Sequence, residues 1–195
     1  YILTNLYLDK GNVEKAFESF MEAYRYDSSI LESIDMLIMS HNDNKSVRFQ
    51  ADLQFSQRLC QEFPLNKPIW MNTGVLLALN DQHKEALQAF EFADAIESDP
   101  MGLYAIAKEH YMLQNFYKSI DYCWRIQKSQ NLTTHVLLGK AFKELKLFDE
   151  ALQQLLIADE KDPEFPFAFS EIVEVLRLMG RIEEIPKFVN RYYET

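Results

Sequence analysis

The chain has 195 residues and a mass of 23.0 kDa, a size that suits one or two ordinary domains. Only 5 glycines and 6 prolines are present, which argues against a turn-rich β-sandwich or barrel. The formal net charge is −10, which disfavours non-specific binding to nucleic acid or to an anionic membrane, because positive charge drives both. No stretch of about eighteen apolar residues occurs, so the sequence predicts no membrane-inserted helix.

An internal repeat runs along the chain. A small residue, followed four positions later by a bulky one and often by a second small one, recurs about every 34 residues. We call the first small residue of each repeat the anchor. In the first five repeats the anchor is a small residue, and in the sixth an isoleucine stands at this position. The six anchors are Ala16, Ala51, Ala86, Ser119, Ala151 and Ile185.

Each repeat is expected to form two amphipathic helices joined by a short turn. Positions 16, 13, 12 and 9 before the anchor trace one face of a helix, and positions 0, 4 and 7 after it trace a second face. The turn between them carries Gly11, Gly180 or polar residues such as Asn80-Asp81. In chain order the expected repeats cover about residues 1–28, 29–65, 66–99, 100–130, 131–163 and 164–195, as one array.

Small anchors explain how such repeats would pack. Gly74 and Gly139 on first helices, and Ala86 and Ala151 on second helices, would let two backbones approach closely. Aromatic side chains such as Phe90 would then fill the space between repeats. One repeat cannot bury both of its apolar faces, so the sequence predicts an all-α solenoid of about six stacked helix-turn-helix units.

This pattern resembles the tetratricopeptide repeat (TPR) over essentially the whole chain. The best match is Thr134 to Pro163, which has Gly139, Phe142, Phe148, Ala151 and Ala158 at the family's spacings. The second repeat matches less well, because Asp35 stands at the usual aromatic position and the turn at residues 40–46 is long. The resemblance implies an α-α superhelix whose first helices line a concave surface that usually grips a peptide.

Residues that could carry out catalysis or bind metal form no recognisable constellation. Cys60 and Cys123 are isolated among apolar neighbours, which predicts buried thiols and no disulfide framework. Three of the four histidines, His83, His110 and His135, fall at core or core-edge positions and are interpreted as structural. No phosphate-binding loop, nucleophile motif or metal-ligand spacing occurs, so we expect no cofactor, no metal and no enzymatic activity.

The concave surface that the resemblance implies gives the candidate site. Positions 15, 14, 11, 8 and 7 before each anchor would line it, and they include a short stripe of lysines between two tyrosines. Such a stripe in an acidic protein would suit an acidic peptide, although solvated lysines on a helix would look the same, and Glu144, Glu171 and Glu174 dilute the charge. The candidate groove residues are Asn72, Tyr104, Lys108, Tyr111, Lys140, Lys143 and Arg177.

These residues bear on several possible functions. A non-enzymatic protein-interaction scaffold that binds a peptide is favoured, and a regulatory or targeting module of a larger enzyme or assembly is the alternative. The net charge disfavours an RNA-reading repeat, and the lysine and asparagine pattern of chaperone-tail clamps is not reproduced. Self-association through exposed repeat ends is a further expectation. The chain starts in a helical pattern without Met, so a fragment of a longer protein is expected. No signal peptide is visible, and a cytoplasmic location is expected.

Overall fold

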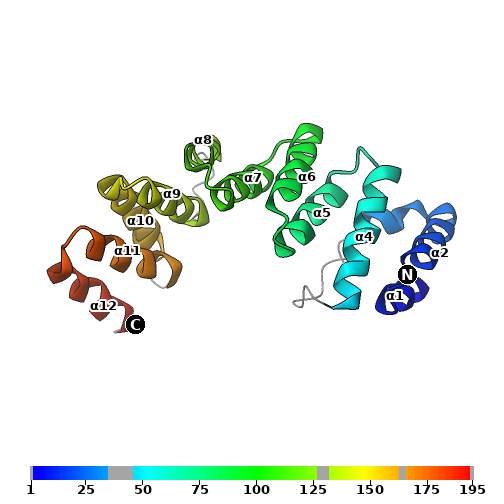
Figure 1. Cartoon of the computed structure of the whole chain (residues 1–195), viewed down its shortest axis with the longest axis horizontal. Helices are drawn as coiled ribbons and strands as arrows, with labels where there is room; N and C mark the ends of the chain where they lie inside the picture. Colours follow the sequence, from blue (N-terminus) through cyan, green and yellow to red (C-terminus); the bar gives the residue numbers. More distant parts are fainter. Residues whose placement is uncertain (1, 35–45, 127–131, 163–165, 194–195) are drawn as a thin grey trace. The chain divides into compact units, whose positions relative to one another are not determined.

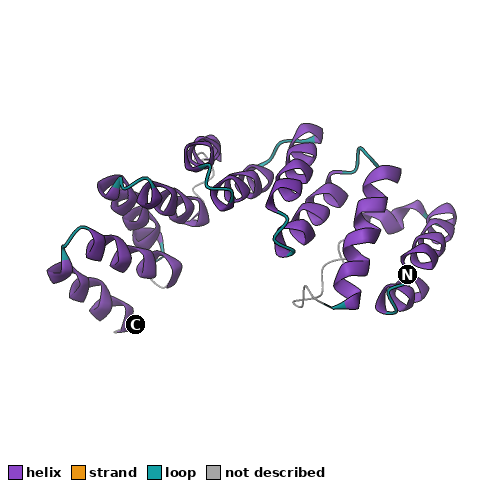
Figure 2. Ribbon diagram, viewed as in Figure 1, coloured by secondary structure: helices purple, strands orange, loops and turns teal. Residues whose placement is uncertain are grey.

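Every regular element that the structure describes is a helix (Figure 2). The computed structural model describes residues 2–34, 46–126, 132–162 and 166–193. Within these ranges the expected all-α architecture is confirmed, and Figure 1 shows consecutive helices running back and forth in pairs. The α-helices are α1 (Ile2–Asp9), α2 (Val13–Tyr26), α4 (Val47–Glu62), α5 (Lys67–Leu79), α6 (His83–Ile96), α7 (Pro100–Met112), α8 (Phe116–Ile126), α9 (Leu132–Glu144), α10 (Phe148–Lys161), α11 (Pro166–Leu178) and α12 (Ile185–Tyr193). Two 3₁₀ turns accompany them, η1 (Ser28–Ser33) and η3 (Ile182–Glu184).

The same turn joins the two helices in five of the repeats. In the turn between α9 and α10, Lys146 has a positive φ of 62°, and the Leu147 N–H donates a 2.9 Å hydrogen bond to the Phe142 carbonyl. This Schellman arrangement satisfies carbonyls at the end of the first helix. The equivalent residues with positive φ are Gly11, Asp81, Gln114 and Gly180. Glycine at two of the turns and polar residues at the others agree with the expectation from sequence.

Side chains also start several helices at the expected places. Asn66 accepts a hydrogen bond from the N–H of Ile69 at the start of α5, and Asp99 accepts one from Gly102 at the start of α7. Each satisfies a backbone N–H that the helix itself leaves unpaired. The repeat boundaries near residues 66 and 100 are therefore set by local hydrogen bonds as well as by packing.

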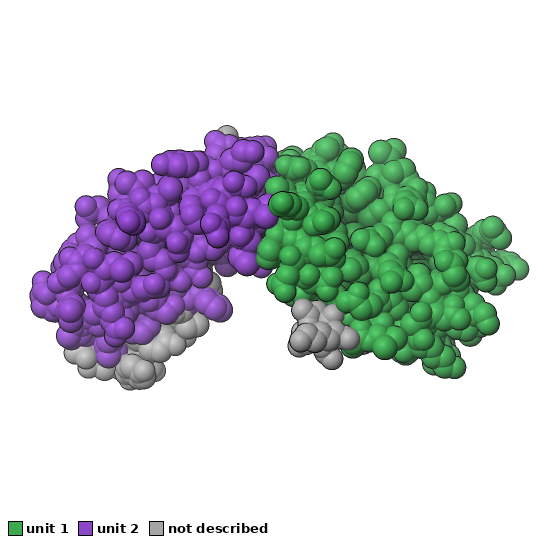
Figure 3. Space-filling view, in the orientation of Figure 1, with its two compact units in different colours: residues 1–102 green, residues 103–195 purple. Residues whose placement is uncertain are grey.

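The helices gather into two compact units, residues 1–102 and residues 103–195 (Figure 3). In the first unit, α1 packs on α2, and α5 packs on both α4 and α6. In the second unit, α9 packs on α8 and α10, and α11 packs on α10 and α12. Helix α7 begins in the first unit and lies mostly in the second. A single array over residues 1–195 remains a prediction.

The small residues of the repeat lie where helices pack. The anchors Ala16, Ala86, Ser119 and Ala151 are fully buried, and Ala51 is 3% exposed. A methyl group on Gly74 would lie 2.5 Å from the ring of Phe90, and one on Gly139 would lie 2.5 Å from Cγ of Leu155. Both distances are shorter than non-bonded contacts of a Cβ atom in proteins. The helices can pack this closely because these two positions lack a side chain.

Of two regions with an unusual sequence for the repeat, the structure describes only one. Asp35 and the long turn at residues 40–46 fall largely in residues 35–45, outside the described residues, as does His41. Pro186 stands at the second position of α12, where its missing N–H costs no hydrogen bond, as expected.

Candidate functional site

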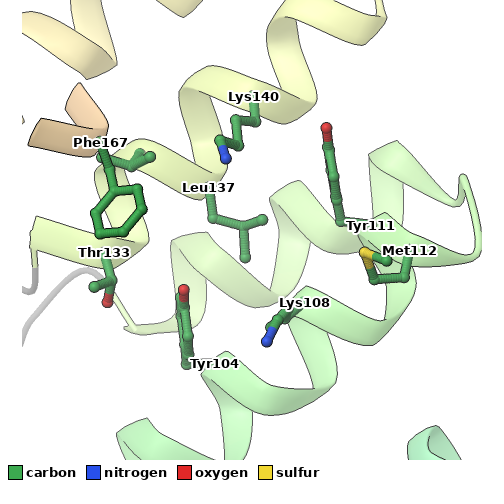
Figure 4. Close-up of a pocket in the computed structure, with 9 residues that line it drawn as sticks. Tyr104, Lys108, Tyr111, Met112, Thr133, Leu137, Lys140 and Phe167 are labelled. Carbon is green, nitrogen blue, oxygen red and sulfur yellow. The ribbon is translucent and has the colours of Figure 1, made fainter. Parts of the chain in front are cut away.

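A pocket with a volume of about 420 Å³ opens on the second unit, between first helices of successive repeats. Helices α7 and α9 form most of its wall, and Phe167 from the first turn of α11 completes it (Figure 4). Two lysines are the charged residues among the lining side chains. The lining residues are Tyr104, Lys108, Tyr111, Met112, Thr133, Val136, Leu137, Lys140 and Phe167.

Two tyrosines line the pocket one above the other on α7, seven residues apart. Burial raises the pKa of Tyr104, and a hydrogen bond with Thr133 on α9 opposes part of the rise. Burial also raises the pKa of Tyr111, and the charge of Glu144 adds to it, as does the hydrogen bond that Tyr111 donates to that carboxylate. Both phenols are therefore neutral at physiological pH.

The two lysines of the pocket differ in their surroundings. Lys108 on α7 is exposed, and within the described part of the chain it has no ion-pair partner. Lys140 on α9 is half-buried, and its Nζ lies 3.2 Å from a carboxylate oxygen of Glu171 on α11. Among the described residues, the positive charge that reaches the pocket without an ion-pair partner is thus that of Lys108.

Lys143 lies beside the pocket without lining it. Its Nζ lies 2.7 Å from Glu171 and 2.7 Å from Glu174, and its side chain is only 11% exposed. Burial disfavours the charged form, but hydrogen bonds to the two carboxylates outweigh this, so the pKa of Lys143 is raised. An ionic cluster of two lysines and two glutamates therefore joins α9 to α11; its members are Lys140, Lys143, Glu171 and Glu174.

The structure brings together four of the seven residues that the sequence proposed for the groove: Tyr104, Lys108, Tyr111 and Lys140. Arg177 is exposed on α11 but does not line the pocket. Asn72 belongs to the first unit and is 7% exposed. It stands 14 residues before its anchor, as Leu137 does, and Leu137 is equally buried at 5%. Asn72 therefore offers little surface to a ligand.

Five lining residues are not among the candidate groove residues. Met112, Val136 and Leu137 fall at the expected offsets, whereas Thr133 and Phe167 each stand 18 residues before an anchor, one helical turn earlier on the same face. Extending the offsets by one turn toward the start of each first helix would have found both.

A second groove of about 410 Å³ lies in the first unit between α2 and α4. Its lining carries three carboxylates and two arginines: Glu18, Glu22, Glu62, Arg25 and Arg58. Arg58 binds Glu14, outside the lining, at 2.5 Å and stacks over the ring of Phe17 at 4.2 Å.

The cysteines are buried, as the sequence predicted. Burial raises the pKa of Cys60 to about 11, with a hydrogen bond between its thiol and Thr73 opposing the rise, and raises the pKa of Cys123 to about 12. A protonated, enclosed thiol is a poor nucleophile. His110 and His135 are buried as well, and His83 is half-buried, which agrees with structural roles. None of the helices in the described ranges is long and apolar enough to span a membrane.

Comparison with known proteins gives the fold its context. No protein-family model matches the chain, and no curated protein matches it in sequence. Solved structures do match: a crystal structure of MamA has a TM-score of 0.68 and 15% identity over 75% of this chain and 88% of that chain. MamA from Desulfovibrio magneticus RS-1 gives 0.68 and 11% identity over 75% and 85% of the two chains.

A third match covers nearly all of both chains. YrrB, described as a TPR protein with an unusual peptide-binding site, has a TM-score of 0.64 and 16% identity over 91% of this chain and 92% of that chain. At such low identity the likeness concerns the fold. The chain therefore has the helical-repeat fold of tetratricopeptide repeat proteins.

Proposed function

We propose that the chain is a non-catalytic protein-interaction scaffold that binds a peptide segment in the pocket of its second unit. The TPR fold is typically a protein-interaction module, and YrrB is described as having a peptide-binding site. The observation that carries the proposal is the pocket itself: about 420 Å³, walled by aromatic and aliphatic side chains, with an exposed lysine among them.

The lining suggests how a peptide would be held. Met112 and Phe167 are 46% and 61% exposed, so a bulky apolar side chain could cover surface that now faces water. Complete burial of one such side chain supplies roughly 1.5–3 kcal/mol. A carboxylate of the peptide near Lys108 would add selectivity and speed of encounter more than affinity. An apolar residue beside an acidic one is therefore the peptide chemistry that fits.

The alternative is that the chain serves as a regulatory or targeting module within a larger enzyme or assembly. The same pocket would then bind a segment of that assembly. The two proposals therefore name different partners but the same binding surface. Self-association through exposed repeat ends is a separate expectation that would not use the pocket.

A selection from a phage-displayed peptide library tests the proposal. We expect enriched peptides that share a bulky apolar residue near an acidic one and that lose binding to the Phe167→Ala variant. Phe92→Ala is the matched control, because Phe92 is 56% exposed on α6 in the first unit. Equal binding to both variants, or no enrichment on the wild-type chain, would refute a site in this pocket.

A further inference from the structure

An ionic cluster of four residues, one of which lines the pocket, suggests how the pocket's charge selectivity is set. Glu171 on α11 is 14% exposed and faces two lysines of α9: Lys140 at 3.2 Å and Lys143 at 2.7 Å. Glu174 binds Lys143 from one helical turn further along α11, also at 2.7 Å. Two cations and two carboxylates make the cluster neutral, so its lysines are occupied by carboxylates of the chain itself.

The consequence differs between the two lining lysines. A carboxylate on a ligand would have to compete with Glu171 for Lys140, and Glu171 holds its place without losing the entropy of association. At Lys108 no carboxylate of the described residues competes. A stripe of three lysines would attract runs of acidic residues, whereas the described residues of the pocket offer one available cation.

We infer that Glu171 is a specificity-determining residue of the pocket. By pairing with Lys140, it leaves Lys108 to bind a single carboxylate next to the bulky apolar residue of the peptide. The preferred partner is therefore a segment with one acidic residue beside a bulky apolar one, and an acidic run has no advantage. This inference rests on the proposed peptide site and adds to it the charge pattern of the ligand.

Four synthetic peptides in a glycine–serine background test the pattern. Each carries one phenylalanine, followed by a glutamate, by a glutamine, by a lysine or by three glutamates. Binding is followed by the NMR shift of the Met112 methyl group, which lies in the pocket wall. For the wild-type chain, we expect the single glutamate to lower Kd about two- to five-fold relative to glutamine, and two further glutamates to change it less than about two-fold.

Three variants assign the effect to residues. Lys108→Gln should abolish the difference between the glutamate and glutamine peptides. Glu171→Gln should release Lys140, so that the three-glutamate peptide binds several-fold more tightly than the single-glutamate peptide. Glu174→Gln is the matched control, because Glu174 contacts Lys143, which does not line the pocket. It should leave the order of the four peptides unchanged.

The outcomes separate the two proposals. If the peptides bind and shift Met112 equally, whatever follows the phenylalanine, the pocket is a peptide site and the inference about charge is wrong. If Glu171→Gln leaves the preference for a single carboxylate intact, Glu171 does not set it. If no peptide shifts Met112 at millimolar concentration, the proposed function itself fails, and the inference with it.

Discussion

Leu155 of α10 lies directly over the backbone of Gly139 on α9, so closely that a Cβ on Gly139 would lie 2.5 Å from the leucine Cγ. Leu155 is fully buried there. Gly74 and Phe90 have the same relationship in the first unit, between α5 and α6. In these two repeats, the distance between the paired helices is thus set by a glycine on the first helix that packs against a large apolar residue on the second.

Gly139→Ala is expected to destabilise the chain by about 1–2 kcal/mol, because Leu155 must leave its place to admit a methyl group. Alanine normally strengthens a helix by up to about 1 kcal/mol relative to glycine, so the sign of the change is diagnostic. Urea unfolding followed by circular dichroism measures it.

Gly102→Ala is the matched control for this change. A methyl group there would meet Asp99 Oδ1 at 3.4 Å and Asp94 Oδ1 at 4.0 Å, both ordinary contacts. Stability should stay the same or rise. A Gly139→Ala variant as stable as this control would contradict the close packing of α9 on α10.

The sequence predicted the parts of the fold that depend on local chemistry. The helix pairs, the turns at Gly11 and Gly180 and the buried anchors all follow from residues a few positions apart. The pocket was found in part, because the offsets of Tyr104, Lys108 and Lys140 follow the helical period. What the period cannot give is which charges pair, since that depends on how side chains of α9 and α11 meet.

Lys143 illustrates this limit. Its helical position is that of Tyr111 in the preceding repeat, 8 residues before the anchor, and this position predicts a side chain that points into the groove. Instead it turns to two carboxylates of the next repeat. The sequence showed that Glu171 and Glu174 dilute the positive charge but not that they hold Lys143.

Lys143→Gln is therefore expected to lower stability by about 1–2 kcal/mol, because it leaves Glu171 without its shorter ion pair. Lys108→Gln, at an exposed site, should change stability by less than about 0.5 kcal/mol. Thermal melts at pH 7 compare the two. Equal melting temperatures would show that the ionic cluster contributes nothing to stability.

The pH dependence of this cluster has a definite sign. Since the pKa of Lys143 is raised above its usual 10.5, its contribution is complete below that value and is lost as the pH rises through the higher folded-state pKa. The stability difference between wild type and Lys143→Gln should thus stay constant from pH 7 to 9 and shrink only above about pH 10.5. Unfolding of both proteins at pH 7, 9 and 11 measures it, and a difference that shrinks by pH 9 would contradict it.

Both thiols should resist modification in the folded chain. Their pKa values, about 11 for Cys60 and about 12 for Cys123, keep them protonated at pH 8, and burial blocks the reagent. An aromatic disulfide reagent should label neither thiol in native buffer within minutes and both in guanidinium. Rapid labelling of either thiol in native buffer would show that its surroundings open readily.

Arg48 is expected to be the most sensitive charged position of the first unit. It is 9% exposed, and it binds Asp52 at 2.7 Å, Asp9 at 2.6 Å and the Asn5 side chain at 2.9 Å, which joins α4 to α1. Arg48→Met would leave the carboxylate of Asp52, only 1% exposed, without this cation, at a cost of about 2–4 kcal/mol.

A second substitution distinguishes a buried charge from lost packing. The double variant Arg48→Met/Asp52→Leu removes both charges, so it should recover much of the lost stability, since a buried ion pair is often replaceable by apolar residues. Arg58→Met, which breaks the exposed pair with Glu14, serves as the control and should cost less than about 1 kcal/mol. If the double variant is no more stable than Arg48→Met alone, the arginine stabilises the first unit mainly by packing and by its hydrogen bonds to α1.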